Sequence, residues 1–377
     1  MAIFDVVIVG AGIVGSAIAR ESARAGLRTA VIEEKVPGSG ITAAGMGHLV
    51  VMDDSPAQLA LTTFSRELWQ QERETLPASI EFESRGTLWV ASDEEEMKEV
   101  HAKRATYEKA GVASEVLDAK TVAAVEPNLR PGLAGGLRVP EDAVVYPPAA
   151  AAHFLSDAQH HGAKLVQGRA AAAGKGEVVL ANSAKLQAER IVLAAGADIS
   201  LLPQLPIQKR KGHLLITDRY PGFAHHQLVE LGYLKSAHKL TDESVAFNLQ
   251  PRQTGQMLIG SSRQFGKVDP AAEPRMLRLM LERAIKYMPK LAALSAIRAW
   301  TGFRASTDDK LPLIGPAEAI TDDPSLWLAM GFEGLGITNA PGAARLLVDQ
   351  LLGNHSALDV TPFLPARLAV KKETEHA

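Results

Sequence analysis

Three glycines near the start of the chain, Gly10, Gly12 and Gly15, form the pattern G-x-G-x-x-G. They follow an apolar run at residues 6–9 and open a helical pattern. In such a unit the first glycine permits a tight turn and the second lets a pyrophosphate approach the backbone. The third lets the helix pack close to the strand, and the helix N-terminus can then face the phosphate charge. The spacing predicts a dinucleotide site.

An acid stands where such a site needs one. Glu33 ends the apolar run at residues 29–33, eighteen positions after Gly15. Its carboxylate is placed to accept hydrogen bonds from an adenosine ribose, and it disfavours the 2′-phosphate of NADP. The alternative interpretation is a glycine-rich β-α-β unit without a ligand.

Four further stretches have the composition of cofactor or substrate contacts. Residues 38–48 are small and hydroxyl-bearing, and residues 191–197 read as a strand that ends in small residues. Residues 300–315 carry one arginine, Arg304, in a turn-rich context. Residues 331–338 are glycine-rich and precede a helix expected from about Asn339 with a polar N-cap. The N-terminus of that helix offers partial positive charge to an anionic group.

The elements that must position these residues change type along the chain. Helices are expected from Pro56 to about 76, capped by Ser55, and over about 93–110, 147–161 and 274–288. A hairpin is expected at 79–91 and an antiparallel sheet over 209–262. We therefore predict an α/β fold (α+β overall). It has a Rossmann-like nucleotide-binding domain (1–78, 141–207 and 306–377) interleaved with an antiparallel-sheet substrate domain (79–140 and 208–305).

Composition excludes several classes of protein. The chain has 377 residues, a net charge of −3 and no cysteine. A disulfide, a CxxC redox pair, a self-ligated iron–sulfur cluster and a cysteinyl cofactor link are therefore excluded. The net charge gives no reason to expect nucleic acid. No membrane span is expected, because glycines interrupt the apolar residues 6–19. A cytoplasmic location follows as an expectation, with peripheral attachment to the inner membrane left open.

Hydrolytic and metal chemistry have no support in the sequence. No GxSxG pattern is present. The histidine pairs at 160–161 and 225–226 are expected at a helix end and in a loop, and no cysteine is present, so no metal site is expected.

Taken together and in this order, the stretches resemble the FAD-dependent D-amino acid oxidase and glycine oxidase superfamily over nearly the whole chain. The ending at residues 333–338 is most similar to flavoprotein subunits of D-hydroxyproline dehydrogenases, opine oxidases and hydrogen cyanide synthases. Residues 232–238 favour the first of these. The superfamily usually has histidine where Phe332 stands, which weakens a hydrogen-bonding role at that position.

The resemblance implies roles for individual residues around FAD. The ADP half would contact Gly10, Ala11, Gly12, Ile13, Gly15, Glu33 and Glu34, with the backbone of Ala170 at the adenine. The pyrophosphate and flavin would contact Thr42, Ala43, Ala44, Gly45, Met46 and Gly196. Backbone amides along the flavin's pyrimidine edge would come from Phe332, Glu333, Gly334, Leu335, Gly336, Ile337 and Thr338.

Three residues are candidates for the substrate. Arg304 can hold a carboxylate through two parallel hydrogen bonds, or it can be a structural arginine paired with Asp308 or Asp309. Tyr233 can bond the same carboxylate or lie near the amine, or be an ordinary sheet-edge tyrosine. His48 can face the amine and accept a proton, or be a loop histidine.

The reaction expected from the resemblance is oxidation of a small amino or imino acid to the imine, with D-hydroxyproline as one candidate. Electrons would pass to oxygen, a partner subunit or a quinone. Two alternatives stay open: a 2-hydroxy acid or polyol-phosphate dehydrogenase, and a non-catalytic flavoprotein subunit of a larger complex.

Overall fold

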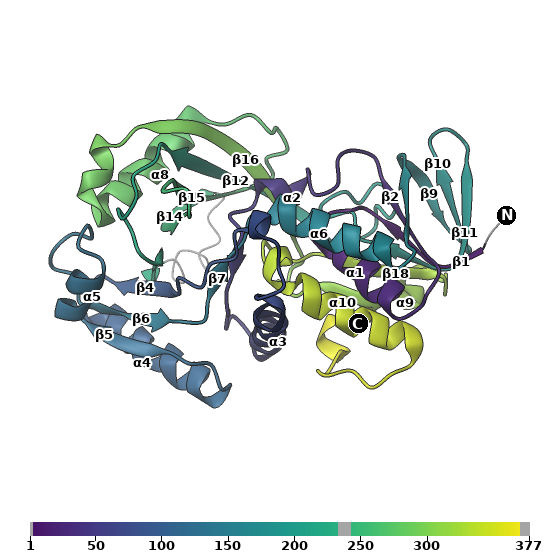
Figure 1. The fold of residues 1–377 in the computed structure, drawn as a ribbon, viewed down its shortest axis with the longest axis horizontal. Helices are drawn as coiled ribbons and strands as arrows, with labels where there is room; N and C mark the ends of the chain where they lie inside the picture. Colours follow the sequence, from purple (N-terminus) through teal and green to yellow (C-terminus); the bar gives the residue numbers. More distant parts are fainter. Residues whose placement is uncertain (1–2, 233–242, 370–377) are drawn as a thin grey trace, which may run out of the picture.

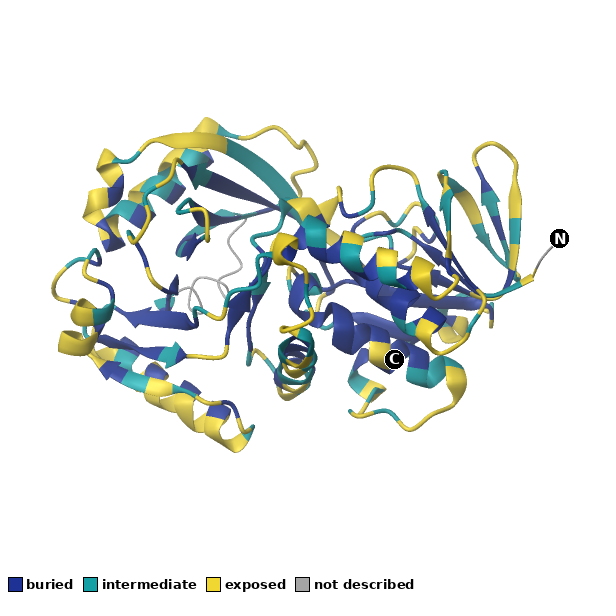
Figure 2. Ribbon diagram, viewed as in Figure 1, coloured by how far each residue is buried: buried dark blue, intermediate teal, exposed yellow. Residues whose placement is uncertain are grey.

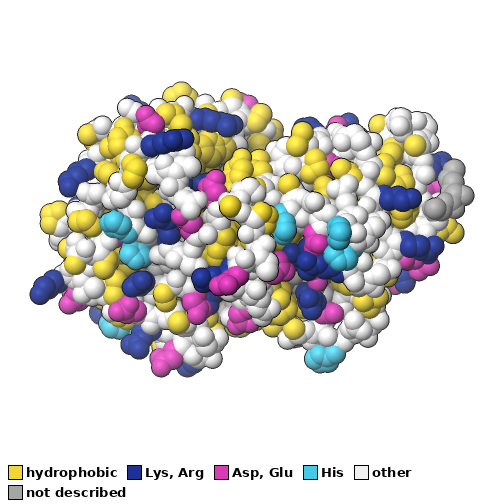
Figure 3. Space-filling view, in the orientation of Figure 1, with side chains coloured by type: hydrophobic (Ala, Val, Ile, Leu, Met, Phe, Trp, Pro, Cys, Tyr) yellow, Lys and Arg dark blue, Asp and Glu magenta, His cyan; other side chains and the backbone are white. Residues whose placement is uncertain are grey.

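The computed structural model describes residues 3–232 and 243–369. The chain forms two large mixed sheets that lie side by side, each with its own helices (Figure 1). This confirms the predicted α/β class. Among the described helices none is long and apolar enough to cross a bilayer. On the face shown in Figure 3, acidic and basic side chains are intermixed.

The first sheet has a parallel centre. Its order is β17-β18-β11-β1-β2-β8, and only β17 runs antiparallel on this path. A hairpin of β9 and β10 adds to β11. These strands are β1 (Ile3–Val9), β2 (Thr29–Glu33), β8 (Lys164–Gln167), β9 (Ala170–Gly174), β10 (Glu177–Leu180), β11 (Lys185–Leu193), β17 (Leu313–Pro316) and β18 (Leu326–Met330).

Helices cover one face of this sheet and form its main core. α1 packs between α6 and α10, and α3 packs on α10. The buried side of this layer is the dark centre of the right half in Figure 2. The helices are α1 (Ile13–Arg24), α3 (Pro56–Glu72), α6 (Pro147–His160) and α10 (Gly336–Leu352). A second core on the other face includes residues of β10 and of the segment after β11.

The second sheet has the order β16-β12-β15-β14-β13-β4-β6-β5 and is mostly antiparallel. α8 lies on one face of this sheet, and α4 packs near its β4–β6–β5 end. The elements are β4 (Thr87–Ala91), α4 (Glu94–Lys109), β5 (Glu115–Asp118), α5 (Ala119–Val125), β6 (Gly135–Val139), β12 (Gln208–Thr217), β13 (Gln227–Glu230), β14 (Glu243–Pro251), β15 (Met257–Phe265), α8 (Pro274–Tyr287) and β16 (Ala296–Ser306).

Short elements join the two sheets. β3 (His48–Leu49) pairs with β7 (Ala143–Val144), and α2 (Ile41–Ala44) lies against β16. The remaining elements are η1 (Ala78–Ile80), α9 (Glu318–Thr321), η2 (Pro289–Ala293) and η3 (Thr361–Phe363).

Most predicted elements are confirmed, and the expected cap of α3 is present because the Ser55 side chain accepts from the Gln58 amide. The hairpin at 79–91 is wrong. β4 pairs with β6 on one side and β13 on the other, so residues 79–86 have no free edge to join. The division into two discontinuous domains stays a prediction.

Candidate active site

The glycine turn after β1 is fixed by close backbone contacts. Gly10 has φ +105°, and a Cβ there would lie 2.7 Å from the Ala194 carbonyl oxygen. A Cβ on Gly15 would lie 1.9 Å from the Gly10 carbonyl oxygen. Only glycine fits either position, because a side chain would overlap backbone. The turn brings the N-terminus of α1 to the edge of a cavity.

Glu33 ends β2 beside this turn. Its Oε2 accepts from the Ala11 amide at 2.8 Å, and its Oε1 accepts from the Lys35 amide at 2.8 Å. β1 and β2 are parallel neighbours, so their carboxyl ends meet at one edge of the sheet. The carboxylate is therefore held at the cavity by the backbone of the turn it faces.

The segment at residues 38–48 closes over α1 and reaches the second sheet. The buried Thr42 hydroxyl accepts from the Ile13 amide at 3.0 Å. The Trp300 indole donates to the Ala44 carbonyl at 3.3 Å, and a Cβ on Gly302 would lie 2.6 Å from the Ala44 Cβ. α2 therefore lies between α1 and β16, where both sheets meet.

The turn before α10 has an unusual backbone. Gly331, Glu333 and Gly334 have φ of +81°, +50° and +98°. The Glu333 amide donates to the Ala305 carbonyl at 2.8 Å, which ties the turn to β16. The prediction of a helix that starts at Asn339 with a polar cap is wrong. α10 starts at Gly336, and Asn339 is a buried residue inside it.

Glu333 turns its side chain to the second sheet. Its Oε1 accepts from Nη1 of Arg210 at 2.8 Å, and both side chains are buried. The sequence offered no signal for this partner, because the two residues are separated by 123 positions. The backbone of residues 332–337 still lines the cavity.

One cavity of about 600 Å³ connects these segments. Its lining includes most of the predicted cofactor residues: Gly10, Gly12, Ile13, Glu33, Glu34, Thr42, Ala44, Gly45, Met46, Ala170, Gly196, Phe332, Glu333, Gly334, Leu335, Gly336 and Ile337. Four predicted residues do not line it: Ala11, Gly15, Ala43 and Thr338. Ala11 and Thr338 act one step away, by hydrogen bonds to Glu33 and to residues 48–50.

Sequence reasoning missed other parts of the lining. Lys35, Arg169 and Lys209 add positive charge, and Trp89 and Asn248 extend the cavity along the second sheet. Strand residues such as Trp89 and Asn248 carry no local motif, because only sheet pairing brings β4 and β14 to one cavity. Tyr233 lies outside the described residues.

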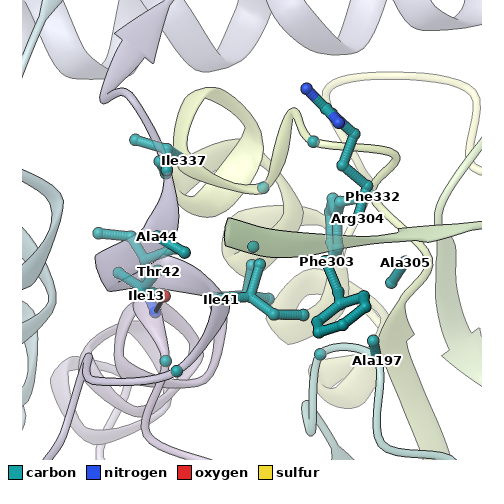
Figure 4. Close-up of a pocket in the computed structure, with 18 of the residues that line it drawn as sticks. Ile13, Ile41, Thr42, Ala44, Ala197, Phe303, Arg304, Ala305, Phe332 and Ile337 are labelled. Atoms are coloured by element: carbon teal, nitrogen blue, oxygen red, sulfur yellow. Dashed lines mark hydrogen bonds between the residues drawn. The ribbon is translucent and has the colours of Figure 1, made fainter. Parts of the chain in front are cut away.

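Arg304 lies on β16 rather than in the turn-rich context that the sequence suggested. It leaves the strand on the side opposite to Phe303 (Figure 4). Its Nη1 donates to the Ser262 carbonyl at 3.2 Å. Two glycines make room for it, since a Cβ on Gly212 would lie 2.5 Å from Nη1 and a Cβ on Gly334 would lie 3.2 Å from Nε.

The alternative to substrate binding was that Arg304 is a structural arginine that pairs with Asp308 or Asp309. The Asp309 carboxylate instead accepts from Arg367, at 2.8 Å from Nε and 3.2 Å from Nη2. Arg304 lines the same cavity as the glycine turn. An arginine there can receive a carboxylate in the geometry that its planar fork prefers.

His48 lines the cavity on β3, and its Nε2 is buried with no hydrogen-bond partner among the described residues. Burial lowers the pKa of His48 to about 4. The imidazole is therefore neutral at physiological pH. It can exchange hydrogen bonds with a bound molecule, but its affinity for a proton is low.

A family model described as FAD dependent oxidoreductase matches residues 5–350. The chain belongs to this family. Glycine oxidase of Pseudomonas aeruginosa is 25% identical over 385 residues, which cover 96% of this chain and 98% of that protein. Hydrogen cyanide synthase subunit HcnC of Pseudomonas protegens is 25% identical over 437 residues and 99% of each chain. The crystal structure of L-proline dehydrogenase from P. horikoshii has a TM-score of 0.88 at 23% identity over 98% of each chain.

The cofactor of this flavoprotein is FAD. The cavity fits it on the chain's own geometry. The glycines of the turn have no side chains to block a pyrophosphate, and the N-terminus of α1 can face its negative charge. The Glu33 carboxylate lies beside this turn. Arg304 lines the same cavity, so the glycine turn and a candidate partner for a carboxylate face one continuous space.

Replacing Glu33 by alanine is expected to raise the dissociation constant of FAD at least about tenfold, because it removes a charged hydrogen-bond acceptor. The measurement is fluorescence titration of the apoprotein with FAD. Glu108→Ala, at an exposed position of α4 away from the cavity, is the matched control, with a change below about threefold. Equal FAD affinity of the Glu33 variant and the wild type would refute the ribose contact.

Replacing His48 by asparagine tests its proton affinity. General bases contribute roughly 100- to 10,000-fold to a rate. With a pKa of about 4, His48 should contribute less than about tenfold to kcat. The pH profile of kcat should also keep its shape above about pH 6. His101→Asn on the exposed face of α4 is the control. A rate limb near neutrality that disappears only in the His48 variant would show that His48 is a base.

Proposed function

We propose that this flavoprotein oxidises the carbon–nitrogen bond of a small amino or imino acid and that Arg304 binds the substrate carboxylate. The observation that carries the proposal is the position of Arg304. Arg304 lines the cavity that begins at the glycine turn, and Gly212 and Gly334 leave space for its side chain. The similarity to glycine oxidase supports a substrate of this chemical class.

The cofactor residues proposed from the sequence fit this scheme. Gly10, Gly12 and Ile13 would bind the pyrophosphate with the N-terminus of α1, and Glu33 the ribose. Thr42, Ala44, Gly45 and Met46, together with residues 332–337, would line the flavin. FAD held by these residues would supply the hydride acceptor for oxidation of the substrate's carbon–nitrogen bond.

Arg304 would supply orientation. The bond from its Nη1 to the Ser262 carbonyl fixes one side of the guanidinium, and the planar fork can meet a carboxylate in the cavity. A carboxylate held in this way restricts the direction of the α-hydrogen, and such positioning lowers the barrier of the reaction.

The low pKa of His48 favours amine over alcohol oxidation. A hydroxyl substrate needs a firm general base, whereas an amine only has to be neutral when the hydride leaves. The neutral His48 imidazole, with its unpartnered Nε2, suits a hydrogen bond to a neutral amine. The 2-hydroxy acid alternative is therefore less well supported. Tyr233 stays a predicted second contact.

Within this class we propose a D-proline-type substrate such as D-hydroxyproline. The similarity to an L-proline dehydrogenase structure extends to the fold. The chain has no cysteine to ligate a cluster of its own. Electrons would therefore leave to oxygen, a quinone or a partner subunit, and the similarity to subunit HcnC supports the last of these.

Anaerobic mixing of the FAD-loaded protein with a substrate panel tests the proposal. The panel contains glycine, both enantiomers of proline and hydroxyproline, lactate and glycerol 3-phosphate, and the visible flavin absorbance is followed. Bleaching by an amino or imino acid is expected. Bleaching by the hydroxy compounds alone would refute the proposal, and no bleaching by any compound would favour a non-catalytic subunit.

Arg304→Lys is expected to raise KM for the bleaching substrate about 10- to 100-fold, since a charged, forked hydrogen bond is replaced by a point charge. FAD affinity should stay within about twofold. Arg298→Lys, at the exposed end of the same strand, is the control. Unchanged steady-state kinetics in the Arg304 variant would overturn its role.

A further inference from the structure

α10 contains a proline one turn after its start. In an α-helix the amide of residue i donates to the carbonyl of residue i−4. Pro341 has no amide hydrogen, so the Ile337 carbonyl lacks its helical donor. Ile337 and Pro341 are both buried. A buried carbonyl without a donor destabilises the folded state, because it has lost its hydrogen bonds to water.

Trp69, on α3, donates a hydrogen bond to this carbonyl in place of the missing backbone amide. Its indole Nε1 lies 3.2 Å from the Ile337 carbonyl oxygen and 3.1 Å from the Thr338 carbonyl oxygen. The side chain is 1% exposed, and its ring packs on Phe154 with a centroid separation of 5.1 Å. The indole is therefore held in place by packing, and its burial keeps solvent from competing for the donor.

The turn that Trp69 bonds is also the one that contacts the cavity segment. The Thr338 hydroxyl donates to the His48 carbonyl at 2.9 Å and accepts from the Val50 amide at 3.3 Å. A Cβ on Gly45 would lie 2.7 Å from Cδ1 of Ile337. A shift of the first turn of α10 would therefore move residues 45–50 as well.

We infer that Trp69 is a positioning residue for the FAD site: its indole N–H replaces the backbone donor that Pro341 lacks and so fixes the first turn of α10. The inference rests on the proposed contact of residues 332–337 with the flavin. Trp69 itself does not line the cavity, so it acts through Ile337 and Thr338.

A double-mutant cycle tests this role. Trp69→Phe removes the N–H and some volume, and Pro341→Ala restores the missing backbone amide. We expect Trp69→Phe to raise the FAD dissociation constant about tenfold, and Pro341→Ala less than about threefold. In the double variant the constant should return to within about threefold of wild type, because the alanine amide introduced by Pro341→Ala can donate to the Ile337 carbonyl. The visible flavin spectrum, shifted in Trp69→Phe, should be restored in parallel.

The cycle separates the effect of the Trp69 hydrogen bond on FAD affinity from the effect of its packing on Phe154. Phe154→Leu loosens the same aromatic contact without removing a donor, and Pro341→Ala should not rescue it. Equal loss of FAD affinity from Trp69→Phe in both backgrounds would overturn the inference. Rescue seen only in thermal unfolding of the apoprotein would also overturn it, because Trp69 would then be structural. Neither result changes which substrates bleach the loaded flavin, so the proposed function is tested separately.

Discussion

The contact between Gly15 and the Gly10 carbonyl is the constraint on which the site depends. A single added Cβ would lie 1.9 Å from that oxygen, so α1 can start where it does only because both residues lack a side chain. The turn then presents amides that need acceptors. Glu33 and the Thr42 hydroxyl supply them, from β2 and α2. The amides of the turn after β1 thereby determine where Glu33 and the segment that carries Thr42 must lie.

The two sheets share the cavity through β16 and the turn before α10. Arg304 and Arg210 are directly opposite on neighbouring antiparallel strands. Two like charges in that relation destabilise a sheet. The Glu333 carboxylate bonds Arg210 at 2.8 Å and offsets its charge. Glu333, whose backbone has a positive φ, therefore joins the turn to the second sheet. Its carboxylate offsets the positive charge of Arg210 beside Arg304.

The sequence predicted the features that local chemistry determines. The glycine turn, Glu33 and the Ser55 cap depend on neighbouring residues, and the helices follow from periodicity. The hairpin at 79–91 failed because β13, from a distant part of the chain, occupies the edge of β4. The low proton affinity of His48 could not be read from its type, since burial determines it. The Arg210–Glu333 pair depends on sheet register, which no motif encodes.

α10 shows how a long-range contact can overrule a local signal. Proline inside a helix costs about 3 kcal/mol, and local propensity alone would end the helix near Pro341. The helix nevertheless continues from Gly336 to Leu352. Part of the cost is the unpaired carbonyl, and the Trp69 indole removes that part by donating from α3. Burial of the helix against α1 and α3 offsets the rest. The first turn of α10 therefore depends on contacts with α1 and α3, which the sequence of the helix alone does not reveal.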